Sequence, residues 1–183
     1  MFFVKTFAAL TCAALVSDTA RGDALSEHDI IGYKKAVATD PVAQLSARLA
    51  QGKTRLIWDA KTGYLPSLMA ALDVPSSSQT LVFSKTSFQR EHISPKTPRA
   101  LYFNDNVYVG YVQGGDLLEL ASIDPVLGAI FYVMDNRRGA GRGPVPHRAH
   151  DECLQCHESG LTNEVPGLFI RSVFPAASGQ PVL

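Results

Sequence analysis

The sequence predicts a mixed α+β fold: helices near the amino end, then an antiparallel β-meander, then an irregular segment that holds the candidate site. Apolar residues recur every three or four positions before residue 75. Short β-branched and aromatic runs, separated by turn residues, fill positions 100–134. A chain of 183 residues has room for one core. We expect a signal peptide at 1–24, an α+β domain at 25–136 and an attachment segment at 137–183.

Residues 1–24 have the pattern of a secretory signal. Met1–Lys5 is a short region with one positive charge, Thr6–Val16 is an apolar run too short to span a bilayer, and small or polar residues follow. Cleavage near Ala20 or Ala24 would remove Cys12. An uncleaved anchor is the alternative. We therefore expect an exported, periplasmic protein with no transmembrane segment once the signal is cleaved.

Two helices are predicted before the meander. Asp40 has a side chain suited to capping a helix, and Pro41 suits the first helical position. A second helix begins at Tyr64-Leu65-Pro66. The residues expected on the buried faces of the two helices are Val42, Leu45, Leu49, Leu65, Leu68, Met69 and Leu72.

The predicted strands are short and separated by turn residues. Two isolated strands are expected at Leu56–Trp58 and Leu81–Phe83. The four strands of the meander are expected at 100–103, 107–112, 117–123 and 129–134.

Cys153-Leu154-Gln155-Cys156-His157 is a C-x-x-C-H motif, the attachment signature of c-type haem. The two thiols can bond to the two haem vinyl groups, and the adjacent His157 can donate a nitrogen to the iron as proximal ligand. Three other readings stay open: a zinc site, a redox disulfide and a structural disulfide. A zinc site usually needs a fourth ligand, and there is no second C-x-x-C pair.

The composition is consistent with one exported haem protein. The chain has three cysteines, and loss of Cys12 would leave only the two in the motif. It has 17 basic and 17 acidic residues, which gives no argument for binding nucleic acid. Arg137–Pro144 is a basic, glycine-rich loop, which we interpret as a solvated connection. The alternative is that one of its arginines reaches a haem propionate or an acidic redox partner.

The position of the motif excludes the all-α class I cytochrome c plan, in which the motif is near the amino end and a methionine ligand follows it. Here the motif is near the carboxyl end and no methionine follows. A distal iron ligand must therefore come from upstream. We expect His92 in this role, because its polar segment is remote in sequence from the motif. The other candidates are His28, Met69, Met134, His147 and His150.

Several segments together resemble a group of exported bacterial cytochrome c-like proteins that is largely uncharacterised. The resemblance covers roughly residues 54–183. It implies one haem c held by Cys153 and Cys156, with His157 on the iron. Members of the group extend further, so we expect a fragment or a shortened member. The segments are Leu81–Gln89, Pro98–Asp105, Cys153–His157, Ser159-Gly160 and Val165-Pro166-Gly167.

We expect a carrier that transfers electrons to and from redox partner proteins, because this role needs the fewest additional residues. The alternative is a haem enzyme or small-ligand sensor with an open iron site. Such an enzyme would need an acid or base over the distal face, which His92 with Arg90 or Glu91 could supply. The motif itself needs no catalytic residue, so we expect an electron carrier rather than an enzyme.

Overall fold

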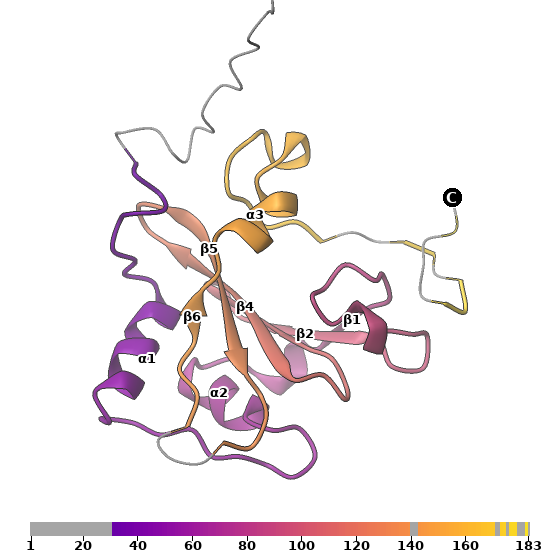
Figure 1. Ribbon diagram of the computed structural model, residues 1–183, viewed down its shortest axis with the longest axis horizontal. Helices are drawn as coiled ribbons and strands as arrows, with labels where there is room; N and C mark the ends of the chain where they lie inside the picture. The colour runs from indigo at the N-terminus through magenta and orange to yellow at the C-terminus, as the bar shows by residue number, and fades with distance from the viewer. Residues whose placement is uncertain (1–30, 140–142, 171–172, 175, 179–181, 183) are drawn as a thin grey trace, which may run out of the picture.

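The computed structural model describes residues 31–139, 143–170, 173–174, 176–178 and 182. Within them the chain forms a six-stranded antiparallel sheet with helices, which confirms the mixed α+β class and excludes an all-α fold. The expected signal peptide at 1–24 lies outside the described residues. Figure 1 shows the helices α1 and α2 toward one end of the molecule and α3 toward the other.

The six strands follow one another in the sheet in chain order, so each pairs with the next along the sequence. This is the meander expected from the regularly spaced turns. The strands are β1 (Thr80–Val82), β2 (Arg99–Phe103), β3 (Val107–Tyr111), β4 (Leu117–Asp124), β5 (Gly128–Asp135) and β6 (His147–Arg148).

Helices α1 (Pro41–Ala50) and α2 (Leu65–Ala71) begin where the sequence predicts. The Asp40 carboxylate accepts hydrogen bonds from the backbone N–H groups of Val42 and Ala43, as an N-cap should. Its second oxygen accepts a hydrogen bond from the Tyr132 hydroxyl on β5. One buried carboxylate thus begins α1 and attaches it to the sheet.

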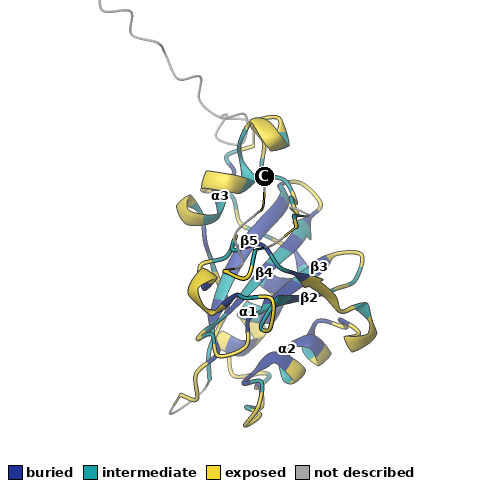
Figure 2. Cartoon of the chain, turned by 90° about the vertical axis from the view of Figure 1, so that its right-hand side faces the viewer, coloured by how far each residue is buried: buried dark blue, intermediate teal, exposed yellow. Residues whose placement is uncertain are grey.

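The strand register separates the side chains of the sheet into two faces. We call the face that contains Leu120 and Tyr132 the inner face; Asp40 bonds to Tyr132 on this side. We call the opposite face, which contains Glu119 and Phe131, the outer face, because successive residues of a strand point in opposite directions. Figure 2 shows the dark blue of buried residues concentrated in the sheet and on the sides of α1 and α2 that face it.

The structure differs from the sequence predictions in three places. Leu56–Trp58 is not a strand; the Ile57 N–H donates to the Ser67 hydroxyl instead of to a neighbouring strand. The sheet extends beyond Asn136, because β6 pairs with β5. The segment expected to be irregular includes the helix α3 (Asp151–His157), followed by a 3₁₀ turn, η4 (Gly160–Thr162).

Candidate functional site

The helix α3 holds all three residues of the C-x-x-C-H motif. Leu154 is buried, and Cys153 packs beside the core. Residues three apart on an α-helix lie on the same side, so Cys153 and Cys156 project from neighbouring positions. Cys153 is partly buried, Cys156 is exposed, and both are free thiols. The sulfur atoms of Cys153 and Cys156 could therefore both bond to one group that lies along the helix.

The environment of Cys153 disfavours a redox disulfide. Burial, and then the negative charges of Glu119 and Glu152, raise the pKa of the Cys153 thiol to about 12. A reactive C-x-x-C pair needs a thiolate with a lowered pKa, which forms in electropositive, accessible surroundings. The thiol of Cys153 therefore stays protonated at neutral pH.

His157 lies on the outer face of the sheet and is oriented by a backbone carbonyl. Its ring packs against Phe131, with 4.3 Å between the ring centroids. Its Nδ1 is 2.9 Å from the carbonyl oxygen of Gly167. A carbonyl can only accept, so this contact requires a proton on Nδ1 and leaves the lone pair on Nε2. Burial lowers the pKa of His157, which favours the neutral ring that can bind a metal.

A compact loop returns Gly167 to His157. The Gly167 N–H donates to the His157 carbonyl at 2.9 Å, so the two residues are joined by two hydrogen bonds. The loop begins with a capping box between Ser159 and Thr162. The Thr162 hydroxyl also lies 3.2 Å from the His157 carbonyl oxygen. This loop holds the Gly167 carbonyl against the imidazole.

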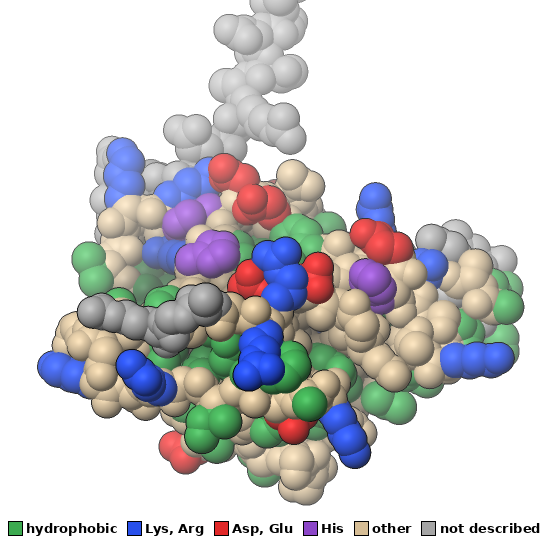
Figure 3. Space-filling model, turned by 60° about the horizontal axis from the view of Figure 1, so that its bottom comes forward, with side chains coloured by type: hydrophobic (Ala, Val, Ile, Leu, Met, Phe, Trp, Pro, Cys, Tyr) green, Lys and Arg blue, Asp and Glu red, His purple; other side chains and the backbone are tan. Residues whose placement is uncertain are grey.

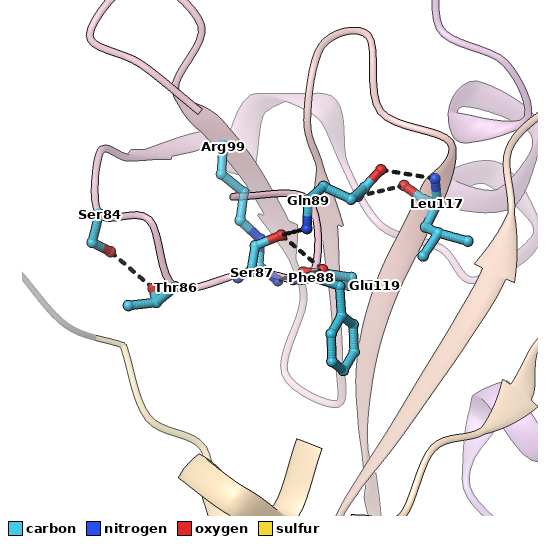
Figure 4. A network of polar contacts seen from close by, with 8 residues as sticks. All are labelled: Ser84, Thr86, Ser87, Phe88, Gln89, Arg99, Leu117 and Glu119. Carbon is cyan, nitrogen blue, oxygen red and sulfur yellow. Dashed lines mark hydrogen bonds and ion pairs between the residues drawn. The ribbon is translucent and has the colours of Figure 1, made fainter. Parts of the chain in front are cut away.

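One row of residues crosses the outer face next to α3. Gly110 on β3 pairs with Glu119 on β4, which pairs with Val133 on β5, which pairs with His147 on β6. Because Gly110 has no side chain, Arg99 extends from β2 across it to Glu119, with 2.7 Å between its Nη2 and the Glu119 Oε2. Figure 4 shows this ion pair with the segment 84–89 around it.

Glu119 has donors at both of its carboxylate oxygens. Its Oε1 accepts hydrogen bonds from the Ser87 hydroxyl at 2.7 Å and from the Phe88 N–H at 2.9 Å, and its Oε2 faces Arg99. Gln89 then bonds both backbone groups of Leu117. The segment 87–89 is thereby fixed along the outer face, as Figure 4 shows.

A shallow hollow of about 260 Å³ lies between this segment, β6 and α3. Its lining is more apolar than polar, and Glu152 at its edge immediately precedes Cys153. The residues that line it are Phe88, Leu117, Val133, His147, Arg148, Ala149 and Glu152.

The sheet separates the candidate axial ligands. Met134 is fully buried on the inner face, paired with Leu118, and Met69 is buried in α2 in the same core. His157 is on the outer face, so neither methionine is on its side of the sheet. His92 ends the 3₁₀ turn η3 (Arg90–His92) and is exposed, with its Nδ1 3.9 Å from the position a Cβ would take at Gly114. His28 lies outside the described residues.

Two arginines of the basic loop already have partners. Arg137 forms an ion pair with Asp135, with 2.7 Å between the Nη2 and Oδ2 atoms, and Arg138 lies over the Trp58 ring. Arg142 lies outside the described residues. Figure 3 shows acidic and basic side chains interspersed over the visible face.

The residues present fit a haem better than a zinc ion. Within the described parts of the chain, no group of three or more His, Cys, Asp or Glu side chains is arranged to hold a metal ion. A zinc site needs three or four such ligands, whereas the porphyrin supplies four nitrogens itself and needs only one or two from the protein. Two thiols on one side of α3 and a histidine with an orientated ring meet that smaller demand.

The chain matches no family model, no curated protein and no solved structure. Within the described ranges, no helix is both long enough and apolar enough to cross a membrane.

Proposed function

We propose that this chain is an exported, periplasmic c-type cytochrome that holds one covalent haem c through Cys153 and Cys156 and transfers electrons. The observation that supports it most is the hydrogen bond between the His157 Nδ1 and the Gly167 carbonyl. Histidines that bind metals nearly always donate their other ring N–H to a carboxylate or carbonyl, which sets the tautomer and raises the basicity of the ligand. His157 has this arrangement on the helix that contains both thiols.

When bound, the haem supplies an iron that alternates between the ferric and ferrous states. The residues of this chain hold and orient it. Cys156 is exposed, so a group bonded to it has an edge near solvent, where a redox partner protein could exchange electrons with it. Phe88, Leu117 and Val133, which line the hollow beside α3, would supply apolar contacts to the group.

The test is expression together with the c-haem maturation machinery. We expect haem staining to persist after denaturing electrophoresis, and the protein mass to increase by one haem. The double variant Cys153→Ser/Cys156→Ser should lose both, while His157→Ala keeps at least one thioether and changes the absorption spectrum. A colourless protein with the bare polypeptide mass would exclude the proposal, and zinc in its metal analysis would favour the zinc reading.

The alternative is an open iron site that binds a small ligand, as in a haem enzyme or sensor. It is favoured by the position of Met69 and Met134 on the side of the sheet opposite to His157. For the six-coordinate carrier we propose His92 as the distal ligand, because Phe88, four residues before it, lines the hollow beside α3.

Carbon monoxide separates the two functions. A six-coordinate ferrous haem that binds carbon monoxide slowly or not at all supports the carrier, and rapid binding supports the open site. If His92 is the distal ligand, His92→Ala should convert a low-spin spectrum to a high-spin one, whereas His147→Ala should not. A high-spin spectrum in His147→Ala and an unchanged one in His92→Ala would show that His147, and not His92, is the distal ligand.

A further inference from the structure

The Arg99–Glu119 pair on the outer face has hydrogen-bonding capacity that the fold leaves unused. Arg99 lies flat across Gly110: a Cβ built there would be 2.5 Å from Nη2, 2.8 Å from Nε and 3.0 Å from Cζ. Only Nη2 bonds to Glu119, and Nε is buried with no hydrogen-bond partner among the described residues. A buried N–H of a cation without an acceptor is costly, so this position favours an acceptor from outside the fold.

Glu119 does not accept from this Nε in the structure. Its Oε1 accepts from the Ser87 hydroxyl and the Phe88 N–H, and its Oε2 faces the Arg99 Nη2. A guanidinium has five N–H donors in a planar fork, which matches a second carboxylate well. The side chain of Arg99 remains 19% exposed, so an incoming anion has access to part of it.

Arg99 is on the same side of the sheet as the C-x-x-C-H helix. Its partner Glu119 shares the outer face with Phe131, on which the His157 ring packs. Glu119, its partner, is on β4 directly beside Val133 on β5, and Val133 lines the hollow beside α3. Adjacent strands lie about 4.8 Å apart, so Glu119, which holds the guanidinium, is one strand spacing from Val133 at the hollow beside α3.

We propose that Arg99 is the anchor for a carboxylate of the bound cofactor, and that Gly110 is required because it leaves space for the guanidinium. This inference rests on the proposed haem attachment. In a haem tethered through its vinyl groups, the two propionates are at the opposite edge of the ring. Arg99 reaches over the outer face of the sheet, the same face on which α3 packs, and could therefore receive one of these propionates. The requirement at Gly110 is for space, because this glycine is not among those with a positive φ.

The test uses matured protein and compares Arg99→Gln, Arg99→Lys and Gly110→Ala with the wild type. The propionate-bending band in resonance Raman spectra reports hydrogen bonding to the carboxylate directly, and spectroelectrochemical titration gives the reduction potential. We expect the band to shift in all three variants. The potential should fall in Arg99→Gln, because loss of a nearby positive charge favours the ferric form. In Arg99→Lys the charge stays, so the potential should change less.

Arg99→Gln leaves Glu119 as a largely buried charge without its ionic partner, which can prevent folding. The double variant Arg99→Gln/Glu119→Gln removes both charges with little change in shape, and it should shift the band while retaining the fold. Arg137→Gln is the matched control, because Arg137 is an exposed arginine that is also paired with a carboxylate. It should leave the band and the potential as in the wild type.

The two proposals fail in different ways. Wild-type protein without covalent haem excludes the attachment and, with it, the anchor. Wild-type protein with covalent haem, but with a band that does not change in Arg99→Gln or in the double variant, excludes the anchor alone. A band that shifts in Arg137→Gln instead would assign the propionate to the basic loop.

Discussion

At the scale of single residues, Asp124 shows how a carboxylate organises the part of the fold that supports the site. It ends β4, and its oxygens accept hydrogen bonds from the N–H groups of Val126 and Leu127 in the turn to β5. They also accept from the N–H and hydroxyl of Thr39, which precedes α1. Although burial alone would raise the pKa of Asp124, the hydrogen bonds from Thr39, Leu127 and Val126 lower it to about 2.

This lowered pKa predicts a loss of stability in acid. A carboxylate whose folded-state pKa lies below its unfolded value contributes stability above the unfolded pKa, and loses it as pH falls through the folded one. For Asp124 that window runs from about pH 4 to about pH 2, and the contribution is about 2 kcal/mol. Asp124→Asn should therefore lower the unfolding free energy at pH 7, and the difference from wild type should diminish toward pH 3.

Urea unfolding followed by far-UV circular dichroism at several pH values measures this effect. The control is Asp59→Asn, because Asp59 accepts similar turn hydrogen bonds from Lys61 and Thr62 but is exposed. It should change stability much less at every pH. A pH-independent deficit in Asp124→Asn would show that the lost hydrogen bonds, and not the ionisation, carry the effect.

At the scale of elements, local signals predicted most of the fold. The first helix has a capping aspartate followed by proline, and the strands β2 to β5 have β-branched runs bounded by turn residues. Leu56–Trp58 had the same composition as a strand but no neighbour to pair with. The two-residue strand β6 and the seven-residue α3 are too short for a periodic signal, so only tertiary contacts define them.

The sequence also predicted part of the candidate site, namely the part that lies within one short motif. Cys153, Cys156 and His157 lie within one short motif, so the sequence identifies them and α3 presents them together. Arg99 and Glu119 are on different strands and meet only through the register, which sequence patterns do not specify. One signal could have suggested the site: a glycine inside a strand, here Gly110, often marks the close approach of another group.

The loop after α3 predicts how the proximal ligand can be tuned. The Thr162 hydroxyl accepts from the Ser159 N–H at 3.0 Å and lies 3.2 Å from the His157 carbonyl oxygen, so it holds the loop that returns Gly167 to the imidazole. Thr162→Val keeps the shape but removes these contacts, and should weaken the hydrogen bond between His157 and Gly167. A weaker bond makes the imidazole less basic, so the reduction potential of the matured protein should rise.

Thr162→Ser is the rescuing variant, because it retains the hydroxyl, and its potential should stay close to that of the wild type. Haem staining should be equal in both variants, since neither changes a thiol. Equal potentials in Thr162→Val and wild type would mean that the loop does not position the ligand. Under the proposed function, Thr162 would be a positioning residue that acts on His157 through Gly167.

At the scale of the whole molecule, the sheet is a partition between a packed core and the candidate site. The inner face is covered by α1 and α2, and its side chains are almost completely buried. The outer face is covered only in part by α3 and the segment 87–89, and it has the hollow and the Arg99–Glu119 pair. The packed core and the candidate site therefore lie on opposite sides of one sheet.

This partition predicts that Met134 has no role at the iron. Met134→Leu replaces one apolar side chain with another of similar volume in the inner core, so stability should change by less than about 1.5 kcal/mol. The ferric and ferrous spectra and the reduction potential of the matured protein should be unchanged, because Met134 is on the side of the sheet opposite to His157. Val133→Met is the complementary variant: it places a thioether on the outer face beside the hollow, where it could reach the iron and change the spectrum. Loss of a methionine-ligand signature in Met134→Leu would instead mean that the haem contacts the inner core, and that α3 must move from its position on Phe131 when the cofactor is attached.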